Sequence, residues 1–127
     1  MVAWTEYEAA ARERGALALE LYVVLSEPSG SADEVKRLLP EHLHYQAEQE
    51  LAGTLAFAGP LSDDSGEEMN GTGLIVYRAD SLERARALAD ADPMHAGGAR
   101  TYRLRRWLIN EGSLQLDVKL SAQTVRL

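Results

Sequence analysis

The chain has 127 residues, of which 46% are hydrophobic and 26% charged, a balance typical of one globular domain with its own core. Its net charge of −7 excludes a general nucleic-acid-binding protein, and the lack of cysteine excludes disulfides, thiolate metal sites and a cysteine nucleophile. No apolar run approaches the ~20 residues of a membrane span, and the acidic first residues do not resemble a signal peptide. We therefore expect a cytoplasmic protein with no nucleic-acid or membrane partner.

The first predicted element is a short helix over residues 4–14. Thr5 and Glu8 have the spacing of a capping box, and Gly15 is suited to the helix end. Trp4, Tyr7 and Ala11 share one face. Either this face packs on the body of the protein, or the segment is a frayed extension.

A strand and a long helix follow. Residues 19–26 alternate between two faces, as a strand does, and residues 33–51 predict a helix that ends at Gly53. Pro40 interrupts this helix because proline lacks the backbone N–H and clashes one turn back. It therefore either takes a first-turn position of the main helix or kinks a continuous one.

The remainder of the chain predicts shorter elements. They are strands over residues 54–58, 74–78, 101–109 and a final strand along 114–120, with a helix over 81–90 that ends at Asp92-Pro93. The acidic stretch between residues 61 and 73 does not have the spacing of an EF-hand, so we predict a solvated loop rather than a calcium site.

The order strand, helix, strand, strand, helix, strand predicts a ferredoxin-like split βαβ (βαββαβ) sandwich of the α+β class. We expect one domain over residues 1–127, with a helical extension at 1–18 and an extra C-terminal strand at 110–127. Tyr22, Val24 and their strand neighbours are too apolar to face water as a group, so we assign them to the face without helices. A second copy packed sheet to sheet would cover that face.

One histidine lies where the helical pattern of residues 33–51 calls for an apolar residue. At about 100° per residue, His42 falls in the middle of one face, and His44 points to the opposite side as a solvated residue. The other residues on the His42 face are Val35, Leu38, Leu39 and Gln46. His42 is either a core histidine that hydrogen-bonds a backbone carbonyl or a functional group.

From about residue 20 to residue 107 the chain resembles a known family, the YciI-like (YCII-related) proteins. The resemblance rests on the order and spacing of several short motifs. These are Leu21-Tyr22-Val23-Val24, His42, Ala58-Gly59-Pro60, Gly73, Asp80-Ser81-Leu82-Glu83 and Ala89-Asp90-Ala91-Asp92-Pro93. It implies a ferredoxin-like fold that forms a dimeric α/β barrel.

The resemblance also implies a histidine–aspartate pair, here His42 and Asp92, in a pocket between the first long helix and the sheet. One member of the family removes chloride from a chlorinated hydroxyhydroquinone, and structurally similar families include muconolactone isomerases. Asp92 has a second interpretation as an ordinary Asp-Pro helix stop. The two extensions are absent from the short family pattern, so no substrate is carried over.

Other candidates surround this pair. We predict Gly59, Pro60, Gly73 and Tyr22 as substrate-binding residues, although the glycines equally suit ordinary turns. Four arginines, Arg100, Arg103, Arg105 and Arg106, form a basic cluster that would either attract a carboxylate or phenolate or pair with acidic groups of the surface or of a dimer partner. His95 either joins the site from the loop that follows Asp92 or is an exposed loop residue, and we expect the latter.

Together these features favour a cofactor-free, metal-free enzyme of the lyase or isomerase type, or one similar to a dehydrochlorinase. In this hypothesis His42 moves a proton on a small cyclic or phenolic acid and Asp92 orients it. The alternative is a non-catalytic module of the YciI-like family that binds a small molecule or serves in assembly.

Overall fold

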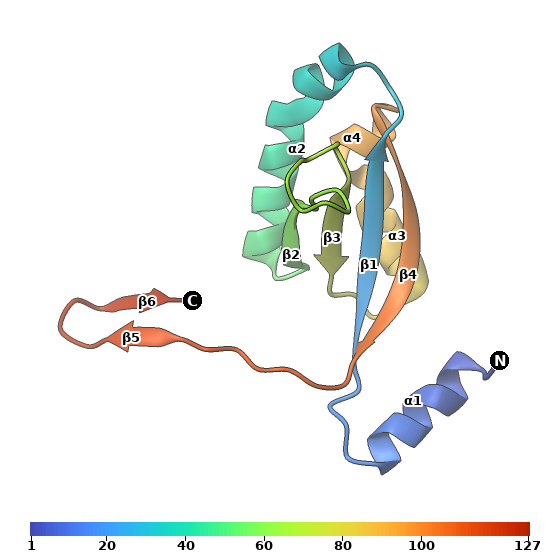
Figure 1. Cartoon of the computed structure of the whole chain (residues 1–127), viewed down its shortest axis with the longest axis vertical. Coiled ribbons are helices and arrows are strands. Elements are labelled where there is room, and N and C mark those ends of the chain that lie inside the picture. Colours follow the sequence, from blue (N-terminus) through green and yellow to red (C-terminus); the bar gives the residue numbers. More distant parts are fainter. The chain divides into compact units, whose positions relative to one another are not determined.

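The computed structural model describes all 127 residues, and its central feature is a four-stranded antiparallel sheet in the order β2-β3-β1-β4 (Figure 1). The strands are β1 (Leu19–Pro28), β2 (Leu55–Pro60), β3 (Gly73–Tyr77) and β4 (Arg100–Ile109). The helices that accompany them are α2 (Ala32–Ala52), α3 (Leu82–Ala91) and the short α4 (Pro93–Ala96). This βαββαβ order confirms the predicted α+β, ferredoxin-like fold.

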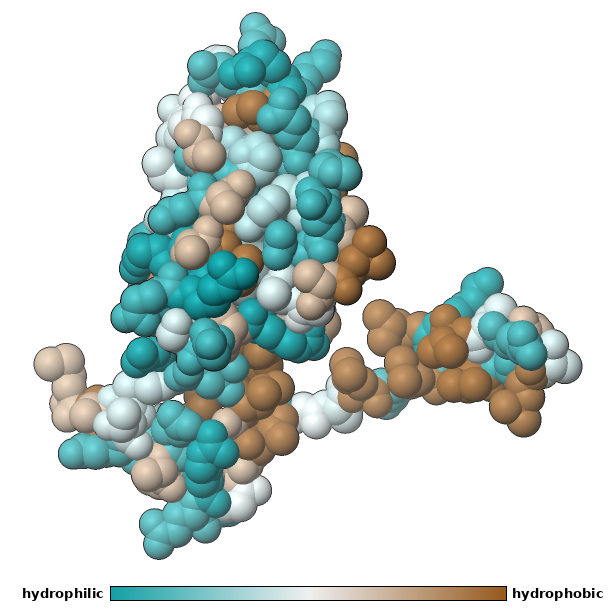
Figure 2. Space-filling view, turned by 180° about the vertical axis from the view of Figure 1, so that it is seen from behind, coloured by the Kyte–Doolittle hydropathy of each residue, from teal (hydrophilic) through white to brown (hydrophobic).

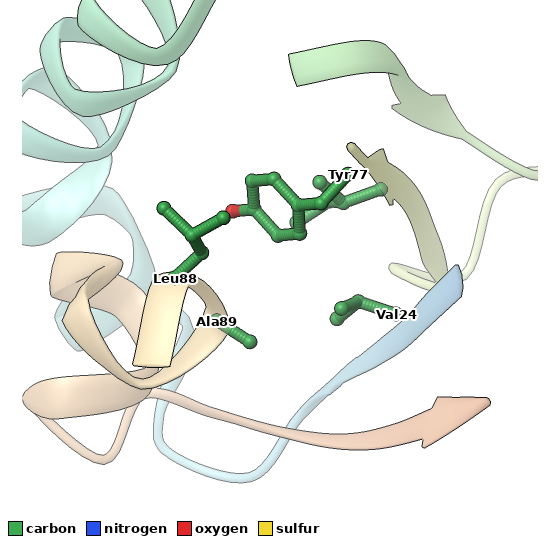
Figure 3. Packing of buried hydrophobic residues seen from close by; sticks show 5 residues of the cluster. Val24, Tyr77, Leu88 and Ala89 are labelled. Carbon is green, nitrogen blue, oxygen red and sulfur yellow. The ribbon is translucent and has the colours of Figure 1, made fainter. Parts of the chain in front are cut away.

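The main core lies between the sheet and α3. Val24 of β1 and Tyr77 of β3 are fully buried and pack with Leu88 and Ala89 of α3 (Figure 3). The assignment of Val24 and Tyr22 to the face without helices was therefore wrong, because Val24 lies under α3 and Tyr22 shares its side of the strand. Alternation divides the residues of a strand into two faces, but it does not determine which face the helices cover.

Helix α2 runs without a break through Pro40. The Ser31 hydroxyl caps its start by accepting from the Glu34 N–H, and Gly53 ends it in the left-handed conformation with φ of 83°. The first-turn alternative for Pro40 is thus wrong. Its missing N–H leaves the carbonyl of Lys36 without the usual helical bond, which a helix held by tertiary packing tolerates.

The two ends of the chain form a separate unit, made of residues 1–19 and 108–127. Ala11 of α1 (Trp4–Glu13) is fully buried and packs with Ala18 and Leu108. The helix therefore packs within this terminal unit, and its predicted packing on the body stays a prediction. The predicted capping box at Thr5 is wrong. The N-cap is Ala3, which offers no side-chain acceptor.

The C-terminal segment forms a hairpin of β5 (Asp117–Lys119) and β6 (Thr124–Arg126). The prediction of one final strand was wrong, because the chain turns back at Gln123, a non-glycine residue with a positive φ of 53°. The segment shows brown along much of its length in Figure 2, and its exposed apolar residues are Leu114, Leu116, Val118, Leu120, Val125 and Leu127. No helix of the chain is both long enough and apolar enough to span a membrane.

Candidate functional site

A cleft of about 610 Å³ lies between α2 and the ends of strands β1, β2 and β3. Its lining is mainly apolar, which is usual for sites that bind small molecules. The apolar side chains include Val35, Leu39, Leu43, Met69, Leu74 and Met94. The polar groups that line it include His42, Gln46, Ser26 and Arg100.

The predicted histidine and aspartate meet at this cleft. Nδ1 of His42 lies 2.8 Å from both carboxylate oxygens of Asp92, although the two residues are 50 positions apart in the chain. The Asp92 side chain is fully buried, whereas the His42 side chain keeps 15% of its surface exposed. The pair therefore places its carboxylate inside the protein and its imidazole at the cleft.

Asp92 also begins a helix. It is the N-cap of α4, and its Oδ1 accepts a hydrogen bond of 3.0 Å from the Met94 N–H. Pro93 takes the first helical position, where its missing N–H costs nothing. Both interpretations of Asp92, as a helix-stop residue and as the partner of His42, agree with the structure. The same carboxylate accepts a hydrogen bond from the backbone of α4 and one from the imidazole of His42.

This geometry determines which nitrogen of His42 faces a ligand. An anionic carboxylate can only accept hydrogen bonds, so Nδ1 of His42 carries the proton that is directed at Asp92. Nε2 has no hydrogen-bond partner within the protein. In the neutral imidazole this nitrogen holds the lone pair, and it is free to accept a proton or a hydrogen bond at the cleft.

A second polar group lies at the same cleft, and sequence reasoning missed most of it. The buried hydroxyl of Ser26 lies 2.8 Å from Nε2 of His95 and accepts a hydrogen bond of 2.8 Å from Nε of Arg100. His95 was expected to be an exposed loop residue, but it is half-buried, and its Nδ1 lies 2.7 Å from the carbonyl oxygen of Ala89. Burial lowers the pKa of His95, with the Ala89 contact acting in the opposite direction.

A signal for this second group was present in the sequence. Ser26 is a polar residue on the same strand face as Tyr22 and Val24. With that face identified as the buried one, a serine on it needs a hydrogen-bond partner. The partners, His95 and Arg100, lie about 70 residues further along the chain, at a distance that no local pattern connects.

The other predicted site residues are divided between the cleft and the rest of the molecule. Gly59, Pro60 and Gly73 line the cleft. Tyr22 does not, since its hydroxyl instead donates to the Glu20 carboxylate at 2.9 Å. His44 is exposed and lies 3.2 Å from Glu48, as expected of a solvated residue.

The basic cluster divides in the same way. Arg100 is half-buried at the cleft, whereas Arg103 and Arg105 are exposed. Arg106 lies 3.7 Å from the Glu20 carboxylate, which agrees with the surface-pairing alternative. Only one of the four arginines is therefore placed to meet a ligand in the cleft.

Comparison with known proteins places the chain in a family. A sequence model of the YCII-related domain matches residues 21–108. The chain belongs to the YCII-related family. The matched range contains the whole four-stranded sheet except its first and last residues, and it includes both His42 and Asp92.

One solved structure of the same fold is 5-chloro-2-hydroxyhydroquinone dehydrochlorinase from Burkholderia phenoliruptrix AC1100, in complex with 2,5-dihydroxybenzoquinone. It matches with a TM-score of 0.55 and 18% sequence identity, over 68% of this chain and 92% of the dehydrochlorinase. At that identity the likeness establishes a shared fold. A sequence search of functionally curated proteins found no match.

Proposed function

We propose that this YCII-related protein is a cofactor-free enzyme of the lyase or isomerase type that moves a proton on a small cyclic or phenolic acid. The observation that carries the proposal is the hydrogen-bonded pair of His42 and the buried Asp92 at the wall of an apolar cleft. Support for the substrate class comes from the structural neighbour, which is a dehydrochlorinase of a chlorinated hydroquinone.

The proposed chemistry uses the free nitrogen of the pair. Nε2 of His42 takes a proton from a ring carbon or hydroxyl, and the electron pair left behind becomes an enolate or a new double bond. In an elimination, chloride departs with its bonding electrons, so that one proton and one chloride leave the ring together. Asp92 holds the Nδ1 proton in place and stabilises the imidazolium that forms.

The test is turnover of chlorinated hydroxyhydroquinones and small unsaturated lactones, followed by chloride release and by exchange of substrate hydrogen with deuterated water. The parent should convert at least one compound, and His42→Asn should lower its kcat on the order of 10²- to 10⁴-fold. His44→Asn is the matched control, because this exposed histidine lies on the same helix and should keep the parent rate. Parent-like turnover by His42→Asn would exclude the proposal.

The alternative function is a binding module, and the apolar lining of the cleft is compatible with it. In that case the parent binds ring compounds without converting any of them. Replacement of His42 by leucine does not separate the two functions, because it would leave the buried Asp92 carboxylate unpaired and destabilise the protein in either case. Binding measured together with deuterium exchange does separate them.

We also propose that two copies pair through the sheet face opposite the helices. The register places Phe57 on this face, and strand alternation places Trp107 there. Both side chains are exposed, by 54% and 43% respectively. A second copy would cover them and give the dimeric α/β barrel that the family resemblance implies.

Light scattering tests the dimer, with an expected mass of twice the 13.9 kDa of one chain. Phe57→Asp should shift the protein toward the monomer. Leu51→Asp is the control, since Leu51 is an equally apolar exposed residue at the end of α2. A parent protein that stays monomeric at micromolar concentration would rule out the barrel.

A further inference from the structure

Arg100 is held in one orientation by three hydrogen bonds from two of its nitrogens. Nε donates to the Ser26 hydroxyl at 2.8 Å, and Nη2 donates to the Ser26 carbonyl at 2.8 Å and to the Gly71 carbonyl. Nη1 has no partner within the protein. A guanidinium is planar, so fixing two nitrogens also fixes the third and the direction of its two N–H groups.

Arg100 forms no ion pair within the protein. The residue is half-buried at the cleft, and no carboxylate of the chain lies within 4.0 Å of its guanidinium. All three of its acceptors are neutral oxygens. A partly buried cation without a partner is costly unless an anion accompanies it. Burial also lowers the pKa of Arg100, against the attraction of Asp92 and Glu27.

Ser26 and His95 complete the support of this side chain. In the neutral form of His95 the proton on Nδ1 is donated to the Ala89 carbonyl, so Nε2 must accept. The Ser26 hydroxyl therefore donates to Nε2 of His95, and its oxygen lone pair accepts the Nε–H of Arg100. Each hydrogen in the chain Arg100–Ser26–His95–Ala89 points in one direction, which holds the guanidinium rigidly.

We propose that Arg100 is the anion-binding group of the cleft and receives the carboxylate or phenolate oxygen of a ring compound, with Ser26 and His95 as positioning residues. The inference deepens the proposed function and rests on it only in taking a ring compound as the occupant. Arg100 and His42 line the same cleft. A bound ring would thus direct its anionic group to Arg100 and its exchangeable proton to Nε2 of His42, with apolar side chains against its faces.

The experiment measures binding by calorimetry of two related probes, 2,5-dihydroxybenzoquinone and its dimethyl ether. The first is a vinylogous acid that is anionic at neutral pH, and the second is uncharged and similar in shape. The parent should bind the anion more tightly. Arg100→Gln should weaken anion binding on the order of 10- to 100-fold and leave ether binding unchanged, because it removes only charge-assisted hydrogen bonds.

Matched variants separate a local from a general effect. Arg103→Gln removes the same charge from an exposed position of β4 and should bind both probes as the parent does. Arg100→Lys keeps the charge without the planar fork and should recover part of the anion affinity. Ser26→Ala should lower the ratio of anion to ether affinity, which a purely structural defect would not change because both probes would weaken together.

A second measurement does not depend on the chosen ring. In protein labelled with ¹⁵N, the Nε resonance of Arg100 should shift saturably when benzoate or the dihydroxybenzoquinone is added. No saturable shift with either anion would overturn the inference, as would equal anion affinity in the parent and Arg100→Gln. The proposed function can fail separately. If His42 has no part in catalysis, His42→Asn keeps the parent rate, and the binding of anions by Arg100 is still expected.

Discussion

Replacement of Asp92 by asparagine tests the pair most directly, because the geometry makes the two side chains incompatible in one protonation pattern. Oδ1 of Asp92 accepts from the Met94 N–H, and both oxygens lie 2.8 Å from Nδ1 of His42. In Asp92→Asn the amide oxygen keeps the Met94 bond, which leaves the NH₂ group facing Nδ1–H of His42. Two donors would then lie 2.8 Å apart, while the amide oxygen, also 2.8 Å from Nδ1, already accepts from the Met94 N–H.

The expected response is a change of tautomer. His42 relieves the conflict by moving its proton from Nδ1 to Nε2, so that Nδ1 accepts from the asparagine amide. The charge-assisted hydrogen bond is lost, which should lower the free energy of unfolding by about 1.5–3 kcal/mol. Asp92→Ala also removes the N-cap of α4 and should cost a further 0.5–2 kcal/mol or so, about what such caps contribute.

The assay is two-bond ¹H–¹⁵N correlation NMR of the imidazoles, which distinguishes protonated from unprotonated ring nitrogens. Urea unfolding of the same samples gives the stability changes. Asp90→Asn is the control, since this exposed neighbour contacts Tyr102 rather than His42. In a His42→Leu background the sign should reverse, because Asp92→Asn there removes an unpaired buried charge. An unchanged His42 tautomer, or strictly additive unfolding energies, would refute the reasoning.

Three further predictions concern stability, measured by denaturant unfolding. Tyr77→Phe should leave the free energy of unfolding unchanged or raise it by up to about 1 kcal/mol, because the Tyr77 hydroxyl is buried without a partner. Tyr45→Phe should lower the free energy of unfolding by about 0.5–1.5 kcal/mol, since the Tyr45 hydroxyl donates to the Leu88 carbonyl at 2.6 Å. A larger loss for Tyr77→Phe than for Tyr45→Phe would contradict the view that only the Tyr45 hydroxyl is hydrogen-bonded. Because burial holds the pKa of His95 below its ordinary value of 6.5, the unfolded chain binds this proton more readily, so stability should fall as pH drops below 6.5. His95→Gln should flatten the dependence in that range, and an unchanged slope would argue against it. Gly53→Ala should cost about 1 kcal/mol because φ is 83° there, whereas Gly59→Ala should stay within about 0.5 kcal/mol, having no positive φ and no atom within 4 Å of an added Cβ.

The fold was largely predictable because its signals are local. Alternation along residues 19–26 marked the first strand of the sheet, and Gly53 marked the end of α2. The errors occurred where a local pattern allows two outcomes. Residues 114–120 alternate as a strand does, but the chain forms a hairpin with the residues that follow.

The candidate site was predictable only in part. His42 was conspicuous because it interrupts an apolar helical face, and the family resemblance associated it with Asp92. The signal of Ser26 depends on knowing that its strand face is the buried one, and a single arginine beside three others is an ordinary feature. His95 was misjudged because exposure in a loop depends on what packs against the loop.

The sequence by itself determined the order of the elements, their approximate ends and the unusual position of His42 on an apolar helix face. These features depend on residues within a few positions of each other. Only the tertiary structure decided which sheet face α3 covers, and only it brought Asp92 to His42 and joined Arg100, Ser26 and His95 into one hydrogen-bonded chain. These contacts span 50 to 74 positions. They form because the sheet places β1 beside β4 and α2 packs against α4, an arrangement set by burial of the whole apolar surface rather than by any short segment.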